Sequence, residues 1–339
     1  MLRQSTVDRS SSVGARALNR LKSRFLDLSP KEASFVRRGF PAVASASRAH
    51  LEEIIESFIG GYNIALVEAD MSQLTERLDS SFTSPFVGFA YEGAGLYFAL
   101  ADLVVPRSEN RLAVFTRSFG EKHDFITMVG GGFAVARIPF GLRRLESYQR
   151  GLDPLTAWCL ADGYGFHHGF FHWRFFIEER GAAPASLDRQ NRSLFDAGVG
   201  RAMWWVFGAD AESIKAAIAP FDRERRAEMW SGIGTAIGYA GGVPTDVMST
   251  LPKLAGEHRF DLLSGIPFAA YMRTKGGNPA PWTDEACSLL LKLTVNETSN
   301  LIAAELTSYL NSTTDESDKR NACYLALRTR VKRRLEDFF

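Results

Sequence analysis

Residues 85–103 read PFVGFAYEGAGLYFALADL and give the clearest indication of the fold. Gly88, Glu92, Gly95 and Ala99 follow the spacing i, i+4, i+7 and i+11, so they share one face of a helix. Three of these four side chains are small. A small face lets another backbone approach closely, although each glycine costs about 1 kcal/mol of helix propensity. We therefore predict a core helix that packs tightly against a neighbour.

The same small face recurs further along the chain, as Ala227, Ser231, Gly234 and Gly238. Other residues keep a fixed register between the two halves. An offset of 139 positions (200−61) pairs Gly61 with Gly200, Phe82 with Phe221, Gly93 with Gly232 and Gly95 with Gly234. After a four-residue deletion the offset becomes 135 (258−123). This second offset pairs His123 with His258, Gly130 with Gly265, Phe133 with Phe268 and Ala134 with Ala269. We predict a duplication of about 100 residues, with the two small-faced helices packed together across a pseudo-dyad.

The absence of any long alternation between apolar and polar residues argues against a sheet. The predicted fold class is mostly α: a helical domain with an internal duplication in two pseudo-symmetric halves. The expected divisions are a flexible basic N-terminal arm at 1–34, helical repeat 1 at 35–150, a central His- and aromatic-rich connecting segment at 151–192, helical repeat 2 at 193–311, and a C-terminal loop and basic helix at 312–339.

Composition argues against several classes of function. The net charge of +1 provides no field that would attract nucleic acid, and the apolar runs are short and interrupted, so no membrane span is expected. Three scattered cysteines give neither a disulfide framework nor a metal-binding spacing, which is typical of a reducing cytoplasm. Residues 130–132 read GGG, but no strand precedes them and no Lys-Ser/Thr pair follows, so a phosphate-binding loop is not expected.

A histidine-rich stretch, LADGYGFHHGFFHW at 160–173, connects the two halves. Pro154 suits the first turn of a helix at 155–162. We expect Gly163 and Gly165 to loosen the chain after that helix, and a second helix to cover 166–177.

Within this second helix, His168 and His172 are spaced i, i+4 and face the same way, which suits a shared metal ion. His167 is expected to point elsewhere. A metal site needs a further ligand, for which the candidates are Glu92, His123 and Asp162. The commoner interpretation of such a pair is an aromatic core with hydrogen-bonded histidines. The cofactor, whether a metal or haem, stays open.

Glu92 is the one large residue on the small face, and Ser231 takes its place in the second half. A carboxylate on a tightly packed face is costly unless it is paired. Its functional interpretation is a ligand or a general acid/base. The alternative is a buried ion pair, with Arg137 or Arg201 as the partner.

Four segments carry a resemblance to a known family: FVGFAYEGAGLYFALAD, LDPLTAWCLADGYGFHHGFF, GVGRAMWWVFGAD and MWSGIGTAIGYAGG. They resemble the bacterial family called "domain of unknown function 1702", and the similarity covers about residues 35–310. The family's central motif usually reads like DGYGFHEG, and here His168 replaces the glutamate. The residues that match family motifs are Glu92, Asp162, Gly163, Gly165, His167, Gly200, Arg201, Trp230, Ser231 and Gly232.

The resemblance implies a role in making or handling a polyene or enediyne intermediate, because the family includes an accessory protein of enediyne antibiotic gene clusters. It supplies no established reaction. It also implies partners, namely an ASPIC/UnbV-type repeat protein and a membrane electron-transfer-like protein.

The first functional hypothesis is an enzyme of natural-product biosynthesis that cyclises, isomerises or oxidatively modifies a hydrophobic polyene-like intermediate. An aromatic-lined cavity between the halves would hold that intermediate. The catalytic candidates are Glu92, Asp162 and His167; the substrate-binding candidates are Tyr164, Phe166, Arg201, Trp204, Trp230 and Ser231; the metal candidates are His168 and His172.

The alternative hypothesis is a non-catalytic carrier, sequestration or scaffold protein for a lipophilic intermediate, with Glu92 and His167 as structural polar groups. The aromatic cluster at 203–207 is more often core than the wall of a cavity. Under either hypothesis we expect a hydrophobic small-molecule ligand, no nucleic acid, and a cytoplasmic protein that reaches a membrane through its partners. A homodimer is compatible with both hypotheses.

Overall fold

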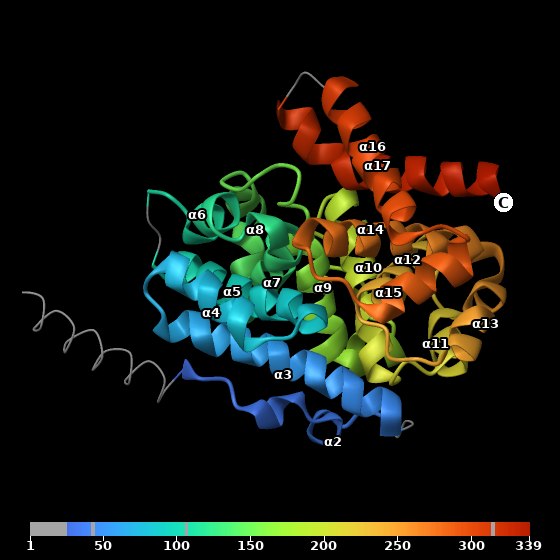
Figure 1. Ribbon diagram of the computed structural model, residues 1–339, viewed down its shortest axis with the longest axis horizontal. Coiled ribbons are helices and arrows are strands. Elements are labelled where there is room, and N and C mark those ends of the chain that lie inside the picture. Colours follow the sequence, from blue (N-terminus) through green and yellow to red (C-terminus); the bar gives the residue numbers. More distant parts are fainter. Residues whose placement is uncertain (1–25, 42–44, 106–107, 313–315) are drawn as a thin grey trace, which may run out of the picture.

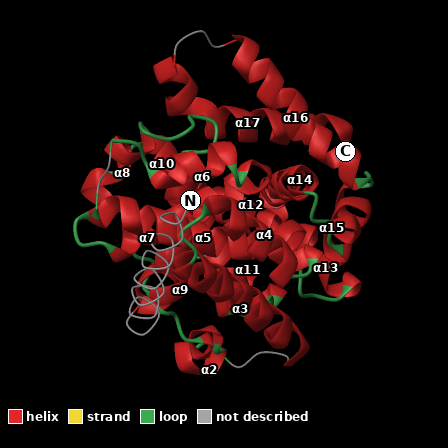
Figure 2. Ribbon diagram, turned by 60° about the vertical axis from the view of Figure 1, so that its left-hand side comes forward, coloured by secondary structure: helices red, strands yellow, loops and turns green. Residues whose placement is uncertain are grey.

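The computed structural model describes residues 26–339, apart from 42–44, 106–107 and 313–315. Every regular element in the described residues is a helix (Figure 1, Figure 2), so the predicted mostly α fold is confirmed. Residues 1–25 of the expected basic arm lie outside the described residues. The longer helices are α3 (Ser45–Val67), α5 (Ser84–Val104), α7 (Asp124–Arg137), α9 (Cys159–Phe171), α10 (Arg189–Val206), α12 (Arg223–Tyr239), α14 (Arg259–Gly276), α16 (Val295–Ser312) and α17 (Glu316–Phe338). The shorter helices are α2 (Phe35–Arg38), α4 (Met71–Ser81), α6 (Arg111–Ser118), α8 (Gly141–Gln149), α11 (Ala211–Ile218), α13 (Thr245–Ala255) and α15 (Pro281–Ala286).

Seven helices form a series in which each packs against the next: α3, α5, α7, α9, α10, α12 and α14. Both ribbon views place α2 and α3 on one side of the molecule and α16 and α17 on the opposite side (Figure 1, Figure 2). The short helices α4 and α11 follow α3 and α10, and each begins at an aspartate. Asp70 and Asp210 cap these two helices, because their side chains accept hydrogen bonds from backbone N–H groups of the first turn.

Adjacent helices of the series touch backbone to backbone at glycines. A β-carbon at any of twelve glycines would lie 1.8–2.2 Å from a carbonyl oxygen of the neighbouring helix, so only glycine fits. The contacts are reciprocal: Gly61–Ala90 and Gly93–Phe58 between α3 and α5; Gly95–Thr127 and Gly130–Glu92 between α5 and α7; Gly132–Leu160 and Gly163–Val129 between α7 and α9; Gly165–Phe195 and Gly198–Asp162 between α9 and α10; Gly200–Met229 and Gly232–Ala197 between α10 and α12; Gly234–Leu262 and Gly265–Ser231 between α12 and α14.

Five of the seven helices carry these glycines as a G-x-G triplet. The triplets are 93–95, 130–132, 163–165, 198–200 and 232–234. Residues i and i+2 lie about 200° apart around a helix, so one glycine faces the preceding helix and the other faces the following helix. Each glycine lowers helix propensity by about 1 kcal/mol, and the close packing on both sides compensates for that cost.

The last helices of the series reach back to its first ones. Arg273 on α14 is almost fully buried, and its Nη1 donates a hydrogen bond of 2.7 Å to the carbonyl of Pro85 at the start of α5. Its guanidinium carbon lies 4.1 Å from the ring centroid of Tyr239, a cation–π contact. On α3, Nε2 of His50 lies 2.7 Å from the carbonyl oxygen of Ala240, just after α12. These contacts give the series an enclosed interior.

The histidine-rich stretch is folded differently from the expectation. Turns occupy 153–158, α9 then runs from Cys159 to Phe171 without a break, and a π-helical turn follows at Arg174–Glu178. Gly163 and Gly165 do not loosen the chain, because both are contact points. Gly163 packs on α7 and Gly165 packs on α10, and this tertiary packing overrides the low helix propensity of glycine.

The expected close packing of α5 against α12 is not what the structure shows. The close backbone contacts of α5 are made with α3 and α7, and those of α12 with α10 and α14. Where α5 and α12 meet, the hydroxyl of Tyr239 lies against Gly88, and the rings of Phe89 and Tyr239 are 5.1 Å apart. The spacing i, i+4, i+7 in the sequence identified a single face of α5. In the structure, Gly93 and Gly95 lie on two opposite faces of this helix and contact α3 and α7.

In the described part of the chain, α5 is the one helix whose length and apolar composition would suffice to span a membrane. However, 78% of its most apolar window is buried inside the fold. A core helix of a globular protein has this same composition, and α5 packs between α3 and α7 as such a helix.

The backbone contacts can be tested with two adjacent glycines of α3. We expect Gly61→Ala to destabilise the fold by about 2 kcal/mol or more, because the new methyl would overlap the Ala90 carbonyl of α5. The matched variant Gly60→Ala meets only the end of the Phe82 ring, which can move, and it gains helix propensity. Urea denaturation of both variants measures the difference. Equal stabilities would contradict the proposed constraint.

Candidate functional site

An apolar cavity, here called cavity A, lies among α3, α5, α7, α9 and α10. Its volume is about 130 Å³. An apolar cavity of roughly 150 Å³ holds one benzene molecule, so cavity A can accept one ring or a short segment of a longer chain. Its walls include the apolar side chains of Ile54, Ile55, Phe58, Ile59, Phe89, Phe133, Phe166, Phe170, Phe171 and Trp205. The described N-terminal segment contributes Leu28, Glu32 and Arg38.

A second, smaller cavity of about 50 Å³, here called cavity B, lies among α7, α9, α10, α12 and α14. Phe89, Arg201 and Trp205 line both cavities. These three side chains therefore stand at the junction between cavity A and cavity B. The interior of the helix series is thus two neighbouring apolar spaces with one arginine between them.

Two acidic side chains of the cavity walls, Glu92 and Asp162, lie near Arg201. Glu92 projects from α5 into cavity A, and Asp162 projects from α9 into cavity B. Nη2 of Arg201 donates a hydrogen bond to Oδ1 of Asp162. The guanidinium carbon of Arg201 lies 4.9 Å from the ring centroid of Phe166, while its Nε is buried with no hydrogen-bond partner. Ion pairing and ring contact together fix this arginine between the two carboxyl groups.

Glu92 is buried, and among the described residues no hydrogen bond reaches its carboxyl group. Desolvation raises the pKa of Glu92 from its usual 4.5 to about 8; nearby Arg201 opposes this rise, and Asp162 adds to it. Burial also raises the pKa of Asp162, against the effect of its ion pair with Arg201. Glu92 is therefore a neutral acid at pH 7, able to donate a proton into an apolar space. Of the partners considered from the sequence, Arg201 pairs with Asp162 rather than with Glu92.

The other predicted ligand-binding residues divide into two groups. Phe166 lines cavity A and Ser231 lines cavity B. Tyr164, Trp204 and Trp230 lie outside the walls of both cavities. Trp204 is fully buried, and its Nε1 donates a hydrogen bond of 2.7 Å to the carbonyl of Gly241. The neighbouring Trp205 faces the cavities instead.

The third predicted catalytic residue, His167, lies with the other histidines rather than with Glu92 and Asp162. Its ring packs against Phe133 and Phe171, and burial lowers its pKa to about 2, with nearby Arg137 contributing to the shift. His167 is therefore neutral. His123, considered from the sequence as a metal ligand, lies at the start of α7 against the ring of Tyr91.

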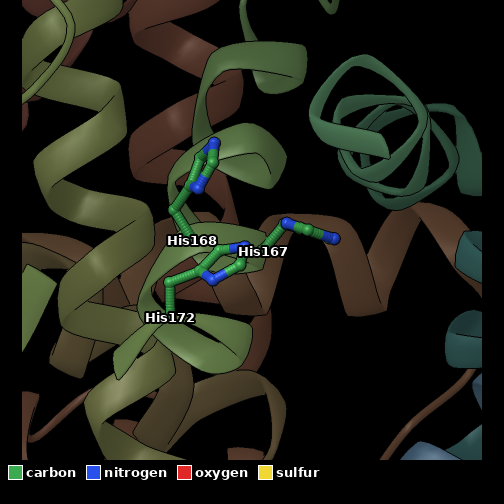
Figure 3. Close-up of side chains that lie close together, drawn as sticks. All are labelled: His167, His168 and His172. Carbon is green, nitrogen blue, oxygen red and sulfur yellow. The ribbon is translucent and has the colours of Figure 1, made fainter. Parts of the chain in front are cut away.

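His167, His168 and His172 form a group at the end of α9 that could hold a metal. One nitrogen from each lies within 4.8 Å of the other two, so His167 lies close to the pair although its ring points in a different direction. The helix ends at Phe171, and this lets His172 turn toward its neighbours. Figure 3 shows the three rings fanning out from the helix end rather than meeting at one point. Nδ1 of His167 and Nδ1 of His168 are buried without a hydrogen-bond partner.

Sequence reasoning did not assign Arg38, Arg137 or Phe89 to a ligand site, yet all three line cavity A. Arg137 was considered only as a partner for Glu92. No sequence signal marked Arg38, because it belongs to a short helix beside the basic arm. Arg137 carried one signal, since a basic residue that ends an otherwise apolar helix must either reach water or line a polar opening.

Ionisation of Glu92 can be tested through stability. Because the pKa of Glu92 is higher in the folded chain than in the unfolded chain, the wild type loses stability as the pH rises from about 4.5 to about 8, by at most about 1.4 kcal/mol per pH unit. We expect Glu92→Gln to match the wild type at the acid end and to become progressively more stable than it up to pH 8. Urea denaturation across this range measures the difference. Glu146→Gln, at an exposed carboxylate, is the control, and a pH-independent difference would mean that Glu92 is ionised.

Comparison with known proteins gives one match. Residues 17–335 match a family described as "Protein of unknown function (DUF1702)". The match extends beyond residues 35–310, which carried the resemblance in sequence, and includes most of α17. No curated protein and no solved structure matches the chain. Since the match covers nearly the whole chain, the protein belongs to the DUF1702 family.

Proposed function

We propose that the protein is an enzyme that binds a hydrophobic, polyene-like intermediate in cavity A and isomerises or cyclises it by proton transfer from Glu92. The observation that carries the proposal is a neutral, unpaired carboxyl group facing an aromatic-lined cavity. An acid with a pKa near the working pH is suited to general acid catalysis. The biosynthetic setting, an enediyne- or polyketide-type pathway, rests on the resemblance alone.

The proposed step needs no co-reactant. A π-electron pair of the polyene takes the proton of Glu92 and forms a new C–H bond, while the O–H electrons remain on the carboxylate. Arg201 lies close enough to stabilise that carboxylate, and the faces of the surrounding rings stabilise the carbocation. Loss of a proton from a neighbouring carbon to Glu92 restores the acid and leaves an isomerised or cyclised product. Asp162 holds Arg201 in place.

A carrier or sequestration protein is the main alternative, since the same cavity would serve it. The two functions differ in the role of Glu92, because an enzyme needs the proton of its carboxyl group and a carrier does not. We expect Glu92→Gln to bind a fluorescent conjugated tetraenoic fatty acid as tightly as the wild type, because glutamine keeps the shape of the side chain. We expect the wild type alone to change the absorption spectrum of the bound polyene over time, with Glu92→Gln slower by about 10²–10⁴-fold.

In this experiment Glu146→Gln is the matched control and should behave like the wild type. If the wild type binds the probe and returns it unchanged, the carrier function stands and the enzyme proposal is wrong. If Glu92→Gln turns the probe over at the rate of the wild type, Glu92 is not the acid.

A second candidate reaction, oxidative modification, depends on a metal ion at the histidine group. Its support is the cluster of three histidines with two buried, unpartnered Nδ1 atoms, those of His167 and His168, whose pKa values are lowered by burial. Around a tetrahedral Zn²⁺ the ligand nitrogens would be roughly 3.4 Å apart, so the rings of His167, His168 and His172 must turn inward on binding. No carboxylate belongs to the group, and the charge of Arg137 acts against a cation.

We expect the group to bind one Zn²⁺ or Ni²⁺ per chain and no Mg²⁺, because imidazole ligands prefer the former ions. Equilibrium dialysis with elemental analysis measures this for the wild type and for the double variant His168→Ala, His172→Ala, which should lose the metal. The control is His50→Gln, which removes a histidine outside the group. Equal metal content in the double variant and the wild type would exclude the site.

We also infer that the chain contains an internal duplication. The support is that the glycine contacts of the first half recur in the second half, with both the glycine and the residue whose carbonyl it touches at equivalent positions. Adding 139 to the pair Gly61 and Ala90 gives Gly200 and Met229, and adding 139 to Gly93 and Phe58 gives Gly232 and Ala197, which are the observed pairs. The two remaining contacts correspond when the offset of 139 applies to α5 and 135 to α7.

The remaining proposals concern the cellular location and the protein partners rather than the ligand site. We propose a cytoplasmic protein that meets a membrane through an electron-transfer-like partner and also binds an ASPIC/UnbV-type repeat protein. These partners follow from the resemblance. The two cysteines whose side chains are described, Cys159 and Cys287, are buried.

A further inference from the structure

Three arginines line cavity A, and they differ in the partners that they find among the described residues. Arg38 donates hydrogen bonds to the side chain and the backbone of Glu32. Arg201 is paired with Asp162. Arg137 also lines the cavity, yet among the described residues no hydrogen bond or ion pair reaches its guanidinium group. Glu92, neutral at pH 7, supplies no counter-charge at this pH.

Arg137 is held in position by aromatic contacts. Its guanidinium carbon lies 5.4 Å from the ring centroid of Phe171, and that of Arg38 lies 4.7 Å from the same centroid. The ring of Phe171 therefore supports both arginines at the cavity wall. Glu32 forms ion pairs with Arg38 and with the more exposed Arg37, and together with Tyr62 it attracts the charge of Arg137 without forming an ion pair with it.

We propose that the ligand of cavity A ends in a carboxylate and that Arg137 binds this carboxylate. The inference rests on the proposed function in taking cavity A as the ligand site. Arg137 is an exposed arginine at the wall of cavity A, and a carboxylate matches its planar guanidinium with two parallel hydrogen bonds. One unpartnered arginine corresponds to a monoanion. A phosphate would call for more free cations.

Glu92 and Arg137 meet α7 at different points along its backbone. Gly130 touches the backbone of Glu92, and Arg137 follows seven residues later on the same helix. Seven residues of α-helix advance roughly 10 Å along the backbone. A terminal carboxylate bound at Arg137 would make the proposed polyene-like ligand a polyenoic acid.

The experiment compares a conjugated tetraenoic fatty acid with its methyl ester, which keeps the chain and removes the charge. Fluorescence titration gives Kd for each probe with the wild type, Arg137→Gln and Arg143→Gln. Arg143 is exposed on α8, outside the cavity walls, and is the matched control. We expect the wild type to prefer the acid, and Arg137→Gln to weaken acid binding by about 10-fold or more while leaving ester binding unchanged. Arg143→Gln should bind both probes as the wild type does.

The outcomes separate this inference from the proposed function. If acid and ester bind equally well in the wild type and in Arg137→Gln, cavity A is a ligand site but the carboxylate is not recognised, and the inference is wrong. If an alkyl monophosphate of equal length displaces the probe better than the acid does, the end group is a phosphate instead. If neither probe binds the wild type, both proposals are wrong. Arg137-dependent binding of an acid that is never converted would uphold the inference and leave the protein a carrier.

Discussion

Contact between glycines and the carbonyl groups of neighbouring helices is the constraint on which this structure depends. At six successive interfaces the backbones approach so closely that a single β-carbon would collide with a carbonyl oxygen. Such approaches allow weak Cα–H···O contacts and dense van der Waals packing. Because the G-x-G triplets place one glycine on each side of a helix, five helices gain close neighbours on both sides. The order of helices in space then follows their order in the chain.

This packing explains why the interior contains ionisable groups at all. Where backbones meet at glycines, little room is left for side chains between helices, so larger side chains are directed to the inside or the outside of the series. Glu92 illustrates the effect, because its carbonyl contacts Gly130 while its side chain faces cavity A. Ser231 likewise contacts Gly265 through its carbonyl, and its side chain faces cavity B, where Asp162 is the described acidic residue.

The sequence predicted the helical class and singled out Glu92 as a candidate, but it did not predict how the residues around Glu92 are arranged. Helical periodicity identified α5 and α7, because their apolar pattern is local. The role of Gly163 and Gly165 could not be read locally, since low helix propensity and close packing have the same sequence signature and only the neighbouring helices distinguish them. The pairing of Arg201 with Asp162 depends on where α9 and α10 cross. The position of Arg38 depends on a segment that returns to the cavity from outside the helix series.

Glu92 and Arg137 together indicate what the interior is built to receive. A carboxyl group kept neutral by burial reduces stability at neutral pH, and a purely structural helix series would lose nothing by placing an apolar residue at position 92. Arg137 is exposed and lines the same cavity. One of these two groups is able to give a proton and the other is able to hold an anion. A ligand that is charged at one end and unsaturated further along would use both groups, and this complementarity supports the proposal that cavity A is a reaction site.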